Sequence, residues 1–79
     1  MRYDIVVPPT ADGSLAVTIA SWIKEVGSPV IKGEDLVEAI TEKITLYVTA
    51  PATGKLVEIL VPVGEKVKVD DVIGFVEGV

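Results

Sequence analysis

The chain has 79 residues, of which 12 are acidic and 7 are basic, and it contains neither histidine nor cysteine. These two absences exclude disulfide bonds, Cys/His metal sites and Ser-His-Asp or Cys-His catalysis within the chain. The formal net charge of −5 disfavours nucleic acid as a partner, and no apolar stretch approaches the roughly 20 residues needed to cross a bilayer.

We therefore expect one soluble, cytoplasmic domain covering residues 1–79, with no signal peptide after Met1 and no membrane or nucleic-acid partner. A domain of this size builds a core but not a deep pocket as well. Its function is expected to lie on the surface, with any reactive group added from outside.

Short apolar runs alternate with turn residues about every 8–12 residues, which is typical of a small all-β sandwich or barrel. The predicted strands cover residues 3–7, 15–24, 36–41, 44–49, 55–61, 67–69 and 72–77. The predicted turns cover residues 27–29, 32–35, 51–54, 62–65 and 70–71. Pro8 and Pro9 end the first strand, because proline donates no hydrogen bond to a ladder.

The second apolar run, residues 15–24, also fits a helix. Apolar side chains at positions 19, 22, 23 and 26 have the spacing of a stripe on one helix face. The β-branched side chains in the same run favour a strand. We predict a strand here.

An internal repeat relates two halves of the chain at a spacing of 37 residues. Residues 26–30 align with 63–67, and residues 33–36 align with 70–73. Two copies are too few for a solenoid, which needs about three. The repeat therefore predicts a domain with quasi-two-fold symmetry, built from two similar halves.

The repeat also predicts where Lys43 lies. A shift of 37 positions takes Lys43 one place past Val79 in one direction and to Val6 in the other. If the repeat is a spatial two-fold, the tight hairpin at Glu42 and Lys43 lies at one end of the domain and the termini lie at the other. Taken alone, Lys43 fits better as a solvated surface lysine in a hairpin. Its central place in the repeat and its flanking motifs reverse that preference.

Two segments resemble the attachment region of lipoyl domains. They are residues 38–44, Glu-Ala-Ile-Thr-Glu-Lys-Ile, and residues 50–56, Ala-Pro-Ala-Thr-Gly-Lys-Leu. The repeated segments 26–36 and 63–67 are similar to further parts of that family, so the resemblance covers nearly the whole chain.

The chain departs from the family pattern at three places. Glu42 stands where aspartate is usual, Ile40 stands where glutamate is common, and the loop at residues 8–16 lacks the family's paired glutamates. In the family this loop lies near the lysine hairpin and contributes to partner recognition. The departures affect the choice of decarboxylase partner more than the attachment of lipoate.

The resemblance implies an all-β fold, a flattened barrel or sandwich of two four-stranded antiparallel sheets with quasi-two-fold symmetry. It also implies that Lys43 carries lipoic acid in amide linkage. Such a domain is a carrier and not an enzyme by itself, within the acyltransferase component of a 2-oxo acid or acetoin dehydrogenase complex. Its lipoyl-lysine swinging arm shuttles acyl groups and reducing equivalents among the complex's active sites.

The implied partners are a thiamin-diphosphate-dependent decarboxylase, the acyltransferase core, dihydrolipoamide dehydrogenase and a lipoate-attaching enzyme. The isolated domain is expected to be monomeric. The resemblance does not choose among pyruvate, 2-oxoglutarate, branched-chain 2-oxo acid and acetoin systems.

Four residues near the hairpin are candidates for recognition by these partners: Thr41, Glu42, Ile44 and Asp12. Thr41 and Glu42 also fit as plain polar hairpin residues, and Asp12 fits better as a turn residue. Trp22 is expected to pack at the core. No carboxylate spacing indicates an acid/base site, and no glycine-rich phosphate loop is present.

Three other functions remain open. A biotin carrier domain shares the fold and the hairpin lysine, but Glu42 and Ile44 replace that family's Met-Lys-Met pattern. The carrier protein of glycine cleavage is usually longer, with extra helical segments. An unmodified β-module that only binds proteins is an alternative of a different class.

Overall fold

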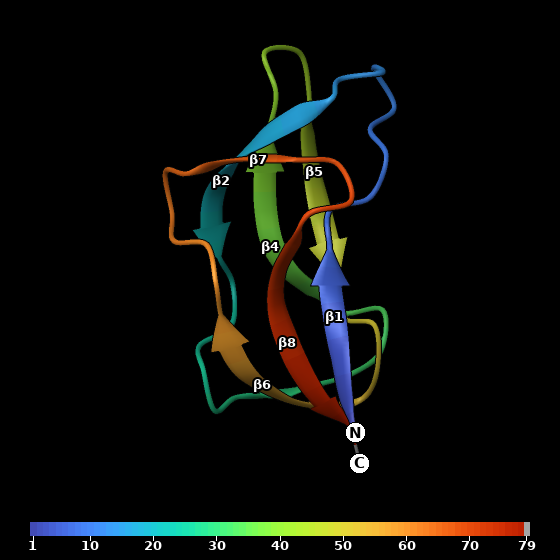
Figure 1. The fold of residues 1–79 in the computed structure, drawn as a ribbon, viewed down its shortest axis with the longest axis vertical. Coiled ribbons are helices and arrows are strands. Elements are labelled where there is room, and N and C mark those ends of the chain that lie inside the picture. The colour runs from blue at the N-terminus through green and yellow to red at the C-terminus, as the bar shows by residue number, and fades with distance from the viewer. Residues whose placement is uncertain (79) are drawn as a thin grey trace.

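The computed structural model describes residues 1–78, and the regular elements in that range are β-strands (Figure 1). The strands are β1 Arg2–Val6, β2 Ala16–Trp22, β3 Pro29–Val30, β4 Asp35–Ile40, β5 Thr45–Thr49, β6 Gly54–Ile59, β7 Lys66–Lys68 and β8 Val72–Gly78. One antiparallel sheet has the order β1-β8-β6-β3, and the other has the order β5-β4-β2-β7. The predicted all-β fold of two four-stranded antiparallel sheets is confirmed.

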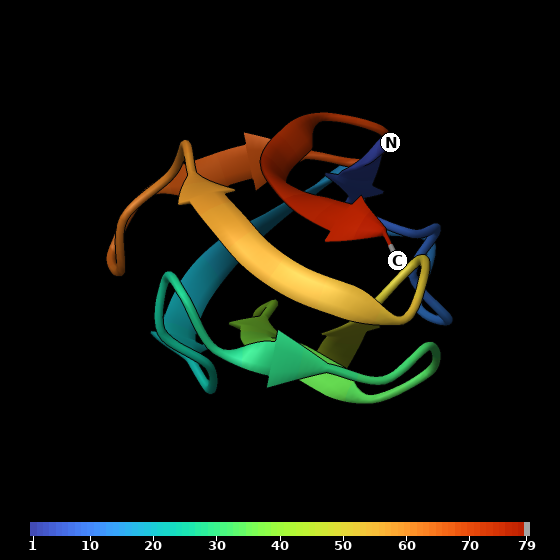
Figure 2. The ribbon, with the colours of Figure 1, turned by 90° about the horizontal axis from the view of Figure 1, so that it is seen from below.

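The two sheets close around one aliphatic core, as the view along the long axis shows (Figure 2). In β2, Val17 and Ile19 are buried while Thr18 between them is half-buried, the period of two expected of a strand with one face inward. The buried core residues are Ile5, Val7, Val17, Ile19, Val30, Leu36, Val37, Ala39, Val48, Ala50, Leu56, Val67, Ile73 and Val76. Over the described range no polar side chain is buried, so polar chemistry is confined to the surface.

The quasi-two-fold symmetry predicted from the repeat is present. Exchanging β1, β8, β6 and β3 for β5, β4, β2 and β7 converts one sheet order into the other. Backbone hydrogen bonds repeat at the same spacing of 37: Gly27 N donates to Leu56 O at 2.7 Å, and Gly64 N donates to Ile19 O at 2.8 Å. Each half therefore binds the other through an equivalent contact.

The turns that follow β3 and β7 are equivalent as well. Gly33 has a φ of 87° and its N–H donates to Ala50 O at 3.0 Å. Asp70, 37 positions later, has a φ of 76° and its N–H donates to Val7 O at 2.8 Å. The same left-handed turn is thus built once with glycine and once with aspartate.

The structure corrects the sequence interpretation at one strand. The sequence predicts a turn at residues 27–29, whereas Pro29 and Val30 form β3, pairing with Lys55 and Gly54 of β6. Two residues are too few to show a strand period, and proline argues against a central strand. Pro29 is tolerated because β3 lies at the edge of its sheet.

The strand interpretation of residues 15–24 is confirmed over Ala16–Trp22, because β2 pairs with both β4 and β7. Trp22 ends this strand half-buried and packs against the core. Its Nε1 donates to Val61 O at 2.8 Å, which satisfies the polar end of the indole. Trp22 is a packing residue, as predicted.

The β4–β5 hairpin and the chain ends lie at opposite ends of the molecule (Figure 1). The longest dimension is 35 Å, against 20 and 16 Å for the other two. At the terminal end, Gly78 N donates to Met1 O at 2.7 Å. The hairpin that contains Lys43 is therefore distal, as the repeat predicts. No helix within residues 1–78 is long and apolar enough to cross a membrane.

Candidate functional site at the β4–β5 hairpin

The β4–β5 hairpin ends in a turn whose backbone is held by the Thr41 side chain. Thr41 N donates to Ile44 O at 2.9 Å and closes the turn. The Thr41 hydroxyl oxygen accepts from Lys43 N at 3.2 Å and from Ile44 N at 3.0 Å. These bonds let Glu-Lys occupy a tip where Asn-Gly is usual, because threonine supplies the turn's hydrogen bonds. They fix the backbone on both sides of Lys43.

The loop between β1 and β2 contacts this turn through Asp12. Asp12 Oδ2 accepts from the Thr41 hydroxyl at 2.9 Å, and Oδ1 accepts from Ser14 N at 3.0 Å. The Ser14 N–H and nearby hydroxyl groups, including that of Thr41, hold the pKa of the Asp12 carboxyl well below its usual range. Asp12 is therefore ionised at neutral pH and links two segments 29 residues apart in sequence.

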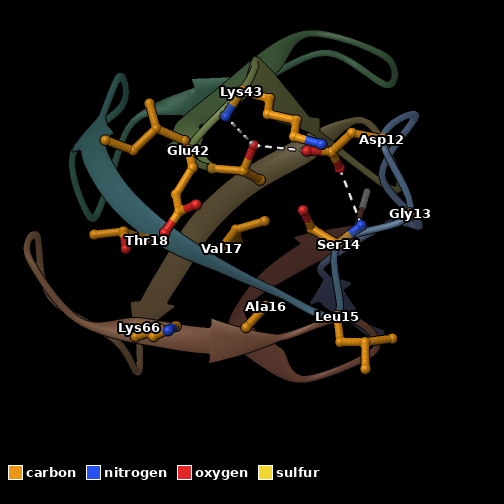
Figure 3. Close-up of a pocket in the computed structure, with 12 residues that line it drawn as sticks. Asp12, Gly13, Ser14, Leu15, Ala16, Val17, Thr18, Glu42, Lys43 and Lys66 are labelled. Carbon is orange, nitrogen blue, oxygen red and sulfur yellow. Dashed lines mark hydrogen bonds between the residues drawn. The ribbon is translucent and has the colours of Figure 1, made fainter.

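Lys43 stands at the tip with its side chain exposed to solvent. Within the described part of the chain, its amine forms no ion pair. Glu42, also exposed, points away from Lys43, whose side chain extends toward the Asp12 loop (Figure 3). The amine is thus accessible to a reagent or an enzyme from the distal end.

An open groove runs beside Lys43, between the hairpin and the β1–β2 loop (Figure 3). Leu15 and Ile40 supply exposed apolar surface to it. Leu15 is 83% exposed, which for a leucine leaves nearly the whole side chain available for contact. The groove is lined by Asp12, Gly13, Ser14, Leu15, Ala16, Val17, Thr18, Ile40, Thr41, Glu42, Lys43 and Lys66.

The structure brings the sequence-predicted residues together at this end of the molecule. Thr41 and Asp12 form one hydrogen-bonded network, Ile44 closes the turn through its backbone, and Glu42 lies at the tip. Their role in partner recognition is a prediction that the structure leaves to experiment.

Sequence reasoning missed two participants. Ser14 follows Asp12 by two positions, a spacing at which an aspartate commonly accepts a backbone hydrogen bond, so this signal was available. Lys66 reaches the groove only because β7 pairs with β2, through Thr18 opposite Lys66. No motif in the sequence around Lys43 indicates that Lys66 lies beside the same groove.

Comparison with known proteins agrees with this geometry. Residues 4–76 match the biotin/lipoyl family model, described as "Biotin-requiring enzyme". The chain is 32% identical to the lipoyl domain of the 2-oxoglutarate dehydrogenase complex from Azotobacter vinelandii, whose solution structure superposes with a TM-score of 0.71. That match covers 95% of this chain and 96% of the other.

Curated relatives are much longer proteins. The chain is 38% identical over 77 residues to the dihydrolipoyllysine-residue succinyltransferase component of the 2-oxoglutarate dehydrogenase complex from Bartonella vinsonii subsp. berkhoffii. It is 39% identical over 71 residues to the component of the same name from Bacillus subtilis. These matches cover 98% and 90% of this chain but only 19% and 17% of the relatives.

The fold and the sequence matches define a small domain to which a cofactor is covalently attached. The chain belongs to the biotin/lipoyl family, as a lipoyl domain. Lipoyl domains of this family carry lipoic acid covalently on a lysine.

Proposed function

We propose that Lys43 is the lysine that carries lipoic acid and that residues 1–79 act as a carrier domain without catalysis of their own. The observation that carries the proposal is the exposed Lys43 amine, which forms no ion pair within residues 1–78 and lies at the tip of a hairpin distal to the chain ends. Of the chain's 7 cationic residues, Lys43 alone occupies this position.

The residues around Lys43 fit a long apolar group in amide linkage. The amine is open to acylation, and the neighbouring groove offers apolar surface at Leu15 and Ile40. Acylation removes one positive charge and takes the formal net charge from −5 to about −6. When bound, the lipoyl dithiolane supplies the thiol and the two-electron redox couple that a chain without cysteine lacks.

The chain's own contribution is presentation. The turn bonds of Thr41 hold the hairpin backbone, and the rigid two-sheet body keeps the tip distal to the ends. A domain held to a larger assembly at its ends would present the arm at a high effective concentration to each active site. Such an arm would let one small module serve several enzymes.

The relatives favour a particular complex. Because they are succinyltransferase components of 2-oxoglutarate dehydrogenase complexes, we infer that this domain serves 2-oxoglutarate oxidation in a soluble cytoplasmic complex. Its partners are then a thiamin-diphosphate-dependent decarboxylase, an acyltransferase core and dihydrolipoamide dehydrogenase. A lipoate-attaching enzyme modifies Lys43.

The attachment site is tested by intact mass after incubation with lipoic acid, ATP and a lipoate-attaching enzyme. The wild type is expected to gain one lipoyl group and Lys43→Gln none. Lys55→Gln, at an exposed lysine of β6, is the matched control and should gain the group. A biotin adduct formed with a biotin-attaching enzyme would favour the biotin carrier, and no adduct with either enzyme would favour an unmodified binding module.

The complex is tested by reductive acylation of the lipoylated domain. The 2-oxoglutarate decarboxylase should acylate it faster than the pyruvate decarboxylase does. Faster acylation from pyruvate would overturn the assignment of the complex but not that of Lys43.

A further inference from the structure

We propose that Asp12 is a positioning residue for the modification of Lys43. Its carboxylate orients the Thr41 hydroxyl, and the oriented hydroxyl holds the hairpin backbone in the conformation that the lipoate-attaching enzyme uses. The inference rests on the proposed attachment at Lys43.

The argument begins with the hydrogen-bonding capacity of the Thr41 hydroxyl. A hydroxyl group has one proton to donate and two lone pairs with which to accept. Lys43 N and Ile44 N, at 3.2 and 3.0 Å, donate to both acceptor positions. The single proton must then point away from the turn, toward an acceptor outside it.

Asp12 supplies that acceptor. Its Oδ2 lies 2.9 Å from the Thr41 hydroxyl oxygen, whereas the competing acceptor, Ile44 O, lies at 3.5 Å. An ionised carboxylate accepts only, and its charge strengthens the bond. The proton is therefore drawn to Asp12, and the oxygen's lone pairs face the two turn N–H groups.

The Asp12 carboxylate is itself held in place by the β1–β2 loop. Its other oxygen accepts from Ser14 N at 3.0 Å, and Thr10 closes the loop from both sides. Gly13 N donates to Thr10 O at 3.2 Å, while the Thr10 hydroxyl donates to Ser14 O at 3.1 Å. A chain of polarised hydrogen bonds thus runs from this loop to the backbone beside Lys43.

We expect the fold to form without this network. It lies outside the apolar core, and the two-fold counterpart of Thr41 is Gly78, which has no side chain to repeat it. The symmetry relates the hairpin to the chain ends, so this polar network has no counterpart in the other half of the molecule. Its loss is expected to alter the hairpin locally and to leave the two sheets intact.

The step that the network assists is acyl transfer to the Lys43 amine. The Lys43 ammonium group first loses one proton to solvent. The neutral nitrogen then attacks the carbonyl carbon of an activated lipoyl donor such as lipoyl adenylate, the bond from that carbon to the phosphate oxygen breaks to release AMP, and the nitrogen loses a second proton to solvent to give the amide. Fixed presentation of the nitrogen favours this step because acyl transfer requires a narrow attack geometry. The expected effect is on kcat more than on KM for the domain.

The test measures lipoylation kinetics of the whole domain. Asp12→Ala and Thr41→Val should each lower kcat/KM by roughly 3- to 10-fold, the range expected for one lost hydrogen bond. The double variant should lose no more kcat/KM than the more affected single variant, because both substitutions remove the same hydrogen bond. Thr41→Ser keeps the hydroxyl and should restore the wild-type value. Asp4→Asn, at an exposed carboxylate of β1, is the matched control.

Amide hydrogen exchange measures the effect of the same hydrogen-bond network in the absence of the enzyme. In Asp12→Ala, the Lys43 and Ile44 amides should exchange faster although Asp12 touches neither. Unchanged exchange, wild-type kinetics of Asp12→Ala, or additive losses in the double variant would overturn the inference. If the wild type itself gains no lipoyl group, the proposed function fails instead, and amide exchange still decides whether Asp12 acts through Thr41.

Discussion

The Trp22 indole occupies space that a side chain at position 74 would need. A Cβ on Gly74 would lie 3.2 Å from Trp22 Cη2 and 2.6 Å from Glu58 O. At the equivalent positions of the other half, 37 residues away, stand the smaller Ile59 and the larger Val37. One half thus combines the large Trp22 with Gly74, whereas the other half combines two side chains of intermediate size, Ile59 and Val37.

Gly74→Ala is therefore expected to lower the free energy of unfolding by about 1–3 kcal/mol, because the backbone oxygen at 2.6 Å must shift. Urea unfolding followed by far-UV circular dichroism measures the change. Val63→Ala, at a side chain that is 58% exposed, is the control and should cost far less. Equal stability of the two variants would contradict the contact described here.

Substitutions at the equivalent turn residues Gly33 and Asp70 are expected to change the stability of the fold in opposite directions. Both residues have positive φ, which glycine adopts freely and other residues adopt at a cost of about 1–2 kcal/mol. Gly33→Ala should destabilise the fold by about 1 kcal/mol, whereas Asp70→Gly should stabilise it by about 0.5 kcal/mol after the entropy of glycine in the unfolded chain is subtracted. Thermal and urea unfolding of both variants check the signs. A loss of stability in Asp70→Gly would refute the equivalence.

Exchanging the two tip residues, Glu42→Lys with Lys43→Glu, keeps the composition and net charge but moves the amine by one position. Because the two side chains point in different directions, the amine would leave the Asp12 side of the tip (Figure 3). We expect the lipoylation rate to fall by about tenfold or more, since small misplacements of a reacting atom are costly. Both residues are exposed, so the melting temperature should not change. Rapid lipoylation of the exchanged protein would show that any tip lysine suffices.

The stabilising effect of Asp12 should depend on pH in one direction. Its pKa is lower in the folded protein than in the unfolded chain, so its contribution is fully present above the unfolded value of about 4 and is lost as the pH falls toward the folded value. Asp12→Asn should thus be less stable than the wild type at about pH 7, and the difference should shrink by about pH 2. Urea unfolding at both pH values measures it. Glu42, Lys43 and Lys66 are the other charged residues of the groove. Lys66→Gln tests whether the charge of Lys66 alters the stability difference. A gap that widens in acid would contradict the lowered pKa.

The sequence allowed the fold class, the two-fold symmetry and the distal position of Lys43 to be predicted, because each depends on spacing along the chain. A repeat of 37 residues is visible in the sequence, and so are the β-branched side chains that favour a strand over residues 15–24. β3 could not be predicted, since Pro29 and Val30 become a strand only through pairing with β6.

The site shows the same division. The repeat and the flanking motifs predict Lys43 as the attachment lysine, and the sequence predicts Asp12 as a turn residue. Its bond to Thr41 joins residues 29 apart in sequence and depends on how the β1–β2 loop folds back over the hairpin. The side chain that most directly holds the backbone of Lys43 thus takes its orientation from a partner that no local pattern identifies.

The hydrogen bond between Gly78 N and Met1 O brings the two ends of the domain to one point. Any tether, from either side, would then pull on the same spot, and a pull there would not stretch the sheets between two separate grips. The folded body, 35 Å in its longest dimension, would be free to rotate about that point with Lys43 at its far end. Reach would come from swinging the whole folded module, and precision from the few hydrogen bonds at its tip.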